Sequence, residues 1–226
     1  MRAHLIAFVN MNYRAILFDF DGTLTPSLPL WIKAFRIALK HFDCEFSDRE
    51  IVRRFFYRDW AVVADELKLE SAEVLQREIH AGLRLAFHEC TLFPEVSSII
   101  ARCRDSGLQT ALVTSAPRFI LDDVLPRVGL HAAFDHIVCA DDVQNHKPHP
   151  EPVLIALAAL IRAPREAIMI GDSTADMLAG KAAGTATALF MPDAETSLQH
   201  AESLRATEPD HIFSDHCELP EIIGLR

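Results

Sequence analysis

The sequence lacks the features that mark membrane, secreted and nucleic-acid-binding chains. No apolar run approaches the ~20 residues that a membrane-spanning helix needs. No dense run of lysine or arginine offers a surface to nucleic acid or an anionic membrane, and the formal net charge is −10. The five cysteines are an odd number without C-x-x-C spacing, which argues against a disulfide framework and a zinc site. We therefore expect a cytoplasmic protein with reduced core thiols and neither a nucleic-acid nor a membrane partner.

The chain length permits one large domain, or one domain with a sizeable insertion. Half of the 226 residues are hydrophobic, so a substantial core can form. The opening segment Met1–Val9 contains an apolar stretch that is too short for a signal peptide. We expect a loose N-terminal extension there, with Met11 as an alternative start.

A short apolar run, Ile16–Phe18, ends abruptly in two carboxylates and a glycine: Asp19, Asp21 and Gly22. Such a run is typical of a strand buried on both faces of a parallel sheet. Alternate side chains of a strand point the same way, so both carboxylates can face one site at the edge where open α/β sheets bind ligands. Two carboxylates so close resist joint ionisation unless a cation or a proton separates them. The pair indicates a divalent metal site or an acid/base pair, and two solvated turn-capping aspartates are the alternative.

The segment from about Leu28 to Glu89 has a helical pattern. It contains one glycine, Gly82, and no proline between Pro29 and Pro94. Apolar residues at helical spacing predict three helices, at about 30–42, 47–63 and 71–87, and Ser47-Asp48-Arg49-Glu50 predicts a capping box for the second. This segment is therefore a helical insertion after the first strand.

Beyond Phe93 the sequence alternates between short apolar strands and helices. Strands are predicted at 109–114, 134–140, 167–170, 187–190 and 211–213, and helices at 95–105, 117–128, 150–161, 174–183 and 197–204. Such alternation predicts an α/β fold, with a doubly wound parallel sheet and helices on both faces. We expect residues 1–26 and 91–226 to form this core and residues 27–90 to form a separate helical domain.

Polar residues follow several of these strands and should meet at one edge of the sheet. They are Asp19 with Asp21, Thr114 with Ser115, Lys147, and Asp172 with Asp176. Each group alone has a simpler explanation as a helix cap or a surface residue. Their joint occurrence just past predicted strands favours a shared site.

In order and spacing these residues resemble the motifs of the haloacid dehalogenase (HAD) superfamily of phosphohydrolases. The four matching segments are Asp19-Phe20-Asp21-Gly22-Thr23-Leu24, Val113-Thr114-Ser115, Lys147-Pro148-His149-Pro150-Glu151 and Gly171-Asp172-Ser173-Thr174-Ala175-Asp176. The resemblance covers about residues 14–215 and is nearest to the phosphoglycolate phosphatase and β-phosphoglucomutase branch. It implies a Rossmann-like core, and residues 27–90 resemble the C1-type cap domain of the family.

The resemblance implies a role for each motif residue. Asp19 would be the nucleophile that becomes an aspartyl-phosphate, and Asp21 the general acid and base. Gly22 would let the backbone turn close to the phosphate. Thr114, Ser115 and Lys147 would bind the phosphoryl group.

The same resemblance implies a magnesium cofactor. Mg²⁺ would be held by Asp19, by the backbone carbonyl of Asp21 and by Asp172, since it prefers oxygen ligands. Asp176 would orient Lys147 or a metal-bound water.

The implied reaction is hydrolysis of a small phosphorylated metabolite by a Mg²⁺-dependent phosphatase. Dehalogenases of the superfamily lack a carboxylate two residues after the nucleophile, whereas Asp21 is present here. A sugar phosphomutase of the same branch would share every core residue and is the alternative. A non-catalytic phosphate-binding protein is the third hypothesis.

The inserted segment should select the substrate, because a cap closes over the sheet edge and excludes water. Its basic residues are expected mostly on solvated helix faces, with one or two available for a substrate carboxylate or second phosphate: Lys33, Arg36, Arg53, Arg54 and Arg58. Trp31 and Trp60 are expected in the core. His146 and His149 lack a matching ligand cluster and are expected to be structural.

Overall fold

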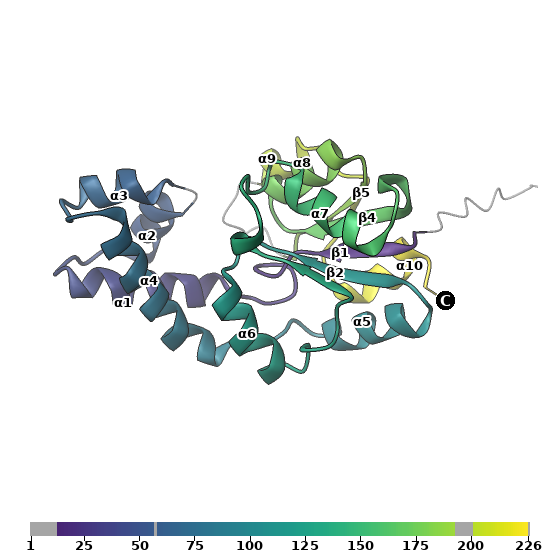
Figure 1. The fold of residues 1–226 in the computed structure, drawn as a ribbon, viewed down its shortest axis with the longest axis horizontal. Coiled ribbons are helices and arrows are strands. Elements are labelled where there is room, and N and C mark those ends of the chain that lie inside the picture. The colour runs from purple at the N-terminus through teal and green to yellow at the C-terminus, as the bar shows by residue number, and fades with distance from the viewer. Residues whose placement is uncertain (1–12, 57, 193–200, 226) are drawn as a thin grey trace, which may run out of the picture.

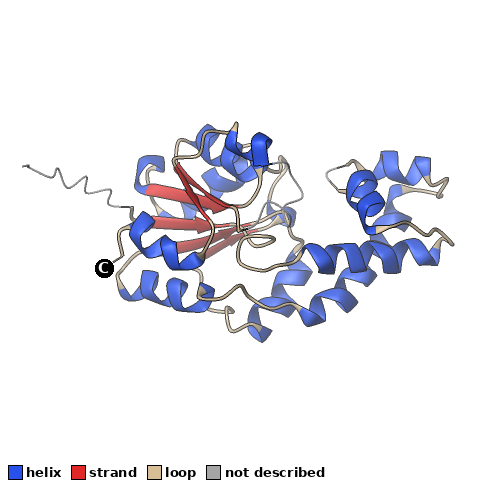
Figure 2. Ribbon diagram, turned by 180° about the vertical axis from the view of Figure 1, so that it is seen from behind, coloured by secondary structure: helices blue, strands red, loops and turns tan. Residues whose placement is uncertain are grey.

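The protein consists of a central parallel sheet with helices on both faces and a group of helices beside it (Figures 1 and 2). The computed structural model describes residues 13–56, 58–192 and 201–225. The expected N-terminal extension and the alternative start at Met11 lie outside these residues. The predicted α/β fold is confirmed.

Within the described residues, the sheet has six parallel strands in the order β3-β2-β1-β4-β5-β6. Their bounds are β1 (Ala15–Phe18), β2 (Gln109–Val113), β3 (His136–Val138), β4 (Ala167–Gly171), β5 (Ala186–Phe190) and β6 (His211–Phe213). All of β1 pairs with β2 on one side and β4 on the other, which explains its uninterrupted apolar sequence. β3 is shorter than predicted because the Asp142 carboxylate accepts the Cys139 N–H and a 3₁₀ turn begins at Ala140.

Alternate residues of β1 face opposite helical layers. Ile16 and Phe18 belong to a core formed with α5 (Val96–Asp105), α6 (Arg118–Arg127) and α10 (Leu219–Ile223). Ala15 and Leu17 belong to a second core formed with α7 (Glu151–Leu160) and α8 (Thr174–Ala183). Both faces of the sheet are therefore covered, as Figure 1 shows, and only its edges and strand ends are left for binding.

Four helices follow β1 and form the group beside the sheet (Figure 1): α1 (Leu28–His41), α2 (Asp48–Phe55), α3 (Trp60–Glu66) and α4 (Ala72–Ala86). α1 and α4 approach closely at Gly82, where an added Cβ would lie 2.4 Å from the Ala34 carbonyl oxygen. The predicted capping box at Ser47 is present.

The prediction of one helix over 47–63 is wrong. The backbone is extended at Phe56, and the Asp59 side chain accepts the Ala61 N–H at 2.7 Å, so it starts a new helix. At the other end of the chain, only α9 (Ala201–Arg205) is seen of the predicted helix 197–204, whose first residues lie outside the described ranges.

All five cysteines are free of disulfides, as expected. Cys90, Cys103 and Cys139 are buried, and burial raises the pKa of the Cys103 thiol to about 12. Cys217 is exposed, so its expected core position is wrong. Within the described ranges, no helix is both long enough and apolar enough to cross a membrane.

Candidate active site

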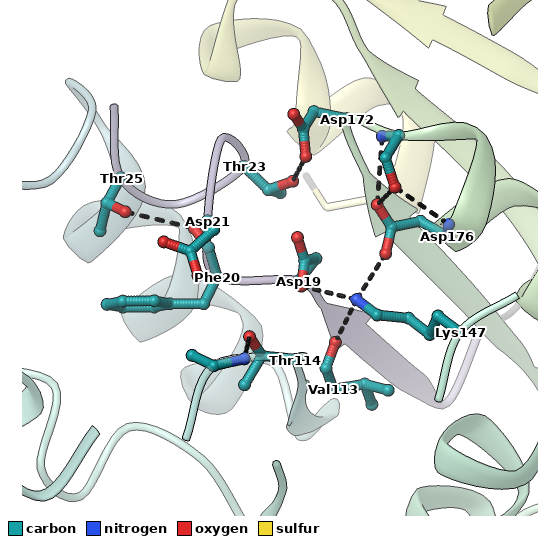
Figure 3. A network of polar contacts seen from close by, with 12 residues as sticks. Asp19, Phe20, Asp21, Thr23, Thr25, Val113, Thr114, Lys147, Asp172 and Asp176 are labelled. Carbon is teal, nitrogen blue, oxygen red and sulfur yellow. Dashed lines mark hydrogen bonds and ion pairs between the residues drawn. The ribbon is translucent and has the colours of Figure 1, made fainter. Parts of the chain in front are cut away.

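The carboxyl ends of β1, β2 and β4 lie side by side and bring the motif residues together (Figure 3). Asp19 directly follows β1, Thr114 follows β2 and Asp172 follows β4. Lys147 reaches them from the loop before α7, and Asp176 lies in the first turn of α8. The expected meeting of these residues at one sheet edge is what the structure shows.

Lys147 is the hub of the buried polar network. Its Nζ donates to Asp19 Oδ1 at 2.7 Å, to Asp176 Oδ1 at 2.6 Å and to the Val113 carbonyl at 3.0 Å. Its side chain is only 5% exposed. Burial alone lowers the pKa of Lys147, but the charges of Asp176 and Asp19 outweigh it and raise that pKa above its ordinary value. The ammonium is therefore charged and fixed in one position.

Three carboxylates crowd around this single ammonium. Asp19, Asp172 and Asp176 each offer an oxygen within 4.8 Å of the others. Burial, followed by the charge of Asp176, raises the pKa of Asp19 to about 7, although Lys147 acts in the opposite direction. The pKa of Asp172 is also raised well above its ordinary value, first by burial and then by Asp176 and Asp19. Carboxylate oxygens are the donors that hard divalent cations prefer, so this cluster fits a divalent metal.

The three carboxylates differ in how many of their oxygens are already hydrogen-bonded. Both oxygens of Asp176 are engaged, Oδ1 by Lys147 and Oδ2 by the Ser173 N–H and hydroxyl. Among the described residues, Asp172 Oδ1 accepts a hydrogen bond from the Thr23 hydroxyl alone, at 3.2 Å. Asp176 is therefore committed to holding Lys147 and the start of α8, which leaves Asp19 and Asp172 better able to bind a cation.

Gly22 permits the close approach between the first and last motifs. Its φ is +77°, and a Cβ at this position would lie 2.2 Å from Asp172 Oδ2. Its N–H donates to the Thr25 carbonyl at 2.9 Å, so this amide closes the turn. Gly22 is needed at this position because any side chain there would clash with the Asp172 carboxylate.

Asp21 faces the helical group rather than Lys147. Its Oδ1 accepts the indole N–H of Trp31 at 2.9 Å, and Ser27 donates a second hydrogen bond. Burial raises the pKa of Asp21, while these two bonds lower it in part. The expectation that Trp31 is a core residue missed this contact, since nothing in the local sequence distinguishes it from a core tryptophan at helical spacing.

The second motif places a buried hydroxyl at the same edge. Thr114 Oγ1 accepts the Ala116 N–H at 3.0 Å, and within the described ranges its hydroxyl proton has no acceptor, so it can donate to a ligand. Ser115 is exposed and lines the same cleft. His146 also lines it, whereas His149 is an exposed residue whose Nδ1 accepts the Glu151 N–H.

A distant residue that the sequence did not single out supports the first motif. His216 is buried beside Phe93, Phe190 and Phe213, and its Nε2 donates to the Thr23 carbonyl at 2.9 Å. Burial lowers the pKa of His216, which keeps the ring neutral with its proton on Nε2. The Thr23 hydroxyl in turn donates to Asp172, so His216 positions Thr23 and, through it, the Asp172 carboxylate. No local pattern links positions 193 residues apart.

A cleft of about 1840 Å³ lies between these strand ends and the helices α1–α4. Asp19, Thr114 and Lys147 line one side, and aromatic residues of the helical group line the other. Trp31 and Trp60 are both half-buried: they pack against the hydrophobic core, as expected, and also line this cleft, which was not expected. The cleft joins the polar cluster to a large apolar surface.

Known proteins match this chain in sequence along most of its length. The family model described as haloacid dehalogenase-like hydrolase matches residues 16–190. A relative named pyrophosphatase PpaX, from Anoxybacillus flavithermus, is 32% identical over 220 residues, which are 95% of this chain and 99% of that protein. A phosphoglycolate phosphatase from Salmonella typhimurium is 28% identical over 245 residues, covering 95% and 94% of the two chains.

The fold also matches solved structures. The crystal structure of CbbY from Rhodobacter sphaeroides in complex with phosphate has a TM-score of 0.77 at 22% identity and covers 92% of this chain and 96% of that one. The family model spans all four motif segments, and its relatives align along nearly the whole chain. The chain therefore belongs to the haloacid dehalogenase-like hydrolase family of enzymes.

Proposed function

We propose that this protein hydrolyses small phosphomonoesters through an aspartyl-phosphate on Asp19, with Mg²⁺ as its cofactor. The observation that carries the proposal is the buried array in which Lys147 bridges Asp19 and Asp176 next to Asp172. Asp21 belongs to the same motif as Asp19 and follows it by two residues. The relatives named as phosphatases support the same reaction class.

In the first half-reaction, an oxygen of Asp19 attacks phosphorus and the bond from phosphorus to the ester oxygen breaks. Asp21 gives its proton to the departing alkoxide, which leaves as an alcohol. The raised pKa of Asp21 favours the protonated carboxyl that this step needs. Lys147 keeps the Asp19 carboxylate in place for the attack.

In the second half-reaction, water attacks the phosphorus of the aspartyl-phosphate and the bond to the Asp19 oxygen breaks. Asp21, now ionised, accepts the proton of that water. Inorganic phosphate leaves, and both carboxyl groups regain their starting states. One residue therefore serves as acid and then as base.

The phosphoryl group needs positive charge and hydrogen-bond donors around its oxygens. Lys147 and the free hydroxyl proton of Thr114 supply two of them, and exposed Ser115 can supply a third. Since the Gly22 amide closes its own turn, the amides of Phe20 and Asp21 are the ones we assign to the phosphate.

Asp19, Asp172 and the backbone carbonyl of Asp21 would hold the Mg²⁺, and Asp176 would orient Lys147. When bound, the ion would offset the charge repulsion between an anionic nucleophile and an anionic substrate. Residues 27–90 would act as the cap domain that covers the cleft, with residues 1–26 and 91–226 forming the core that carries the chemistry.

Release of inorganic phosphate from a panel of phosphomonoesters tests the proposal. We expect turnover with Mg²⁺, its loss on chelation and its return when Mg²⁺ is added. Asp19→Asn should lower kcat by at least about a thousandfold, as expected for removal of a nucleophile. Asp105→Asn, at the exposed end of α5, is the matched control and should retain activity. Turnover retained by Asp19→Asn would falsify the mechanism.

A further inference from the structure

The cations of the helical group that line the cleft are already engaged by acidic partners. Lys33 Nζ lies 2.7 Å from Glu89 Oε1, and Arg36 pairs with Asp48. Arg58 donates to both oxygens of Glu66, at 3.0 and 2.6 Å. The mutual hydrogen bonds raise the pKa of Arg58 and lower the pKa of Glu66, so both remain charged.

These ion pairs connect parts of the helical group. The Arg36 pair joins α1 to α2, the Lys33 pair joins α1 to the turn after α4, and the Arg58 pair joins the loop before α3 to the end of α3. A substrate anion that took Arg36 from Asp48 would leave Asp48 unpaired beside a second negative charge. Each exposed pair is individually weak, so it is the three pairs together that reduce the net attraction for a second anionic group.

The remaining surface on this side of the cleft is mainly aromatic and aliphatic. Its apolar members are Leu28, Trp31, Ile32, Phe35, Phe55, Phe56, Trp60 and Leu83, and the uncharged or weakly basic side chains of Ser27, Gln76 and His80 lie among them. Trp31 is central to it, with ring centroids 5.7 Å from Phe87, 6.3 Å from Phe35 and 6.5 Å from Phe56. The Trp31 indole also touches Asp21, the residue that would protonate the leaving group. The leaving group must therefore depart alongside this aromatic surface.

We propose that the protein's preferred substrates are phosphomonoesters whose leaving alcohol is uncharged and apolar, with an aromatic or aliphatic body packed on Trp31, Phe56 and Trp60. The inference rests on the proposed phosphatase function and names its substrate class. It separates this chain from the relatives named as pyrophosphatase and phosphoglycolate phosphatase, whose named substrates carry a second anionic group.

The kinetic test compares substrates that share a phosphate and differ in the leaving group: ethyl phosphate, benzyl phosphate, 2-phosphoglycolate and pyrophosphate. Buried apolar surface contributes about fourfold per methylene, so benzyl phosphate should exceed ethyl phosphate in kcat/KM by at least about tenfold. The carboxylate of 2-phosphoglycolate should lower kcat/KM about tenfold below ethyl phosphate. The inference is overturned if 2-phosphoglycolate equals or exceeds ethyl phosphate, or if benzyl phosphate gains nothing.

A binding test keeps the inference separate from catalysis. The non-hydrolysable counterparts are propylphosphonate, 2-phenylethylphosphonate and 3-phosphonopropanoate, titrated calorimetrically into the full chain with Mg²⁺. We expect the phenylethyl compound to bind most tightly and the carboxylated one least. If no ester is hydrolysed but this order holds, the proposed function fails while the apolar site stands. The reverse order overturns the inference alone.

Variants that release the paired arginines provide the second arm. Glu66→Gln with Asp48→Asn changes only exposed carboxylates, so the fold should persist. The ratio of kcat/KM for 2-phosphoglycolate to that for ethyl phosphate should rise at least fivefold, because Arg58 and Arg36 become available. Asp105→Asn removes one exposed carboxylate outside the cleft and should leave the ratio as it is. An unchanged ratio in the double variant would show that ion pairing does not govern selectivity.

Discussion

Trp31→Phe tests whether a residue of α1 affects the proton transfer that we propose for Asp21. The change removes the indole N–H that donates to Asp21 Oδ1 at 2.9 Å and retains a ring that can pack on Phe35 and Phe87. A hydrogen bond to a charged group contributes about 1.5–3 kcal/mol. In the proposed mechanism Asp21 becomes ionised as it protonates the leaving group, so the bond would strengthen toward the transition state. We expect kcat to fall about tenfold, with a limit near a hundredfold if the whole bond is expressed there.

The assay is steady-state hydrolysis of ethyl phosphate, whose small leaving group depends least on ring contacts. Because the bond acts on proton transfer, kcat should fall more than KM rises. Phe46→Leu is the control, since Phe46 packs on Phe55 within the helical group and does not line the cleft. Its kcat should match that of the parent protein, with both variants folded by thermal unfolding. A Trp31→Phe kcat within twofold of the parent value would refute the reasoning.

Two further predictions concern stability. Gly82→Ala should lower the free energy of unfolding by about 1–3 kcal/mol, measured from urea midpoints, because the added Cβ would meet the Ala34 carbonyl at 2.4 Å and push α1 from α4. An unchanged or higher midpoint would mean that the helices separate freely. Burial lowers the pKa of His216, so below about pH 6.5 the unfolded chain binds a proton that the folded chain excludes. Stability should therefore fall as pH drops from 7.5 to 5.5, by up to about 1.4 kcal/mol per pH unit from this group. His216→Gln keeps a donor for the Thr23 carbonyl and should flatten that slope; equal slopes would exclude His216 as the cause.

The sheet and the polar site were predictable because both follow from short-range rules. An apolar run such as Ile16–Phe18 is typical of a strand buried on both faces of a parallel sheet, and β1 does lie between two neighbours. Parallel strands all end at one edge, so residues that directly follow them, such as Thr114 and Asp172, must meet there. The sequence therefore located the cluster without any knowledge of its distances.

Contacts between distant or separately folded segments were not predictable in this way. Helical spacing predicts a core position for Trp31, but whether its ring meets a core or a cleft depends on where α1 lies relative to the sheet. His216 is joined to Thr23 across 193 residues, and no local pattern encodes that pairing. The break after Phe55 was missed because the apolar periodicity continues through Trp60. The Asp59 side chain hydrogen-bonds to the backbone there and begins a new helix, so this local bond competes with continuation of the first one.

The place where the helical group leaves the core explains why it can influence the chemistry. Only the turn at Gly22 and the segment to Ser27 separate the end of β1 from α1, and the turn is fixed by the Gly22, Leu24 and Thr25 amides. Trp31 therefore follows Asp21 by ten residues and reaches its carboxylate directly. Any movement of α1 must stretch or break this bond, so the position of the helices and the hydrogen bonding of the acid are coupled. In the proposed function, the side chains around Trp31, which line the cleft, would therefore select the leaving group that the site accepts.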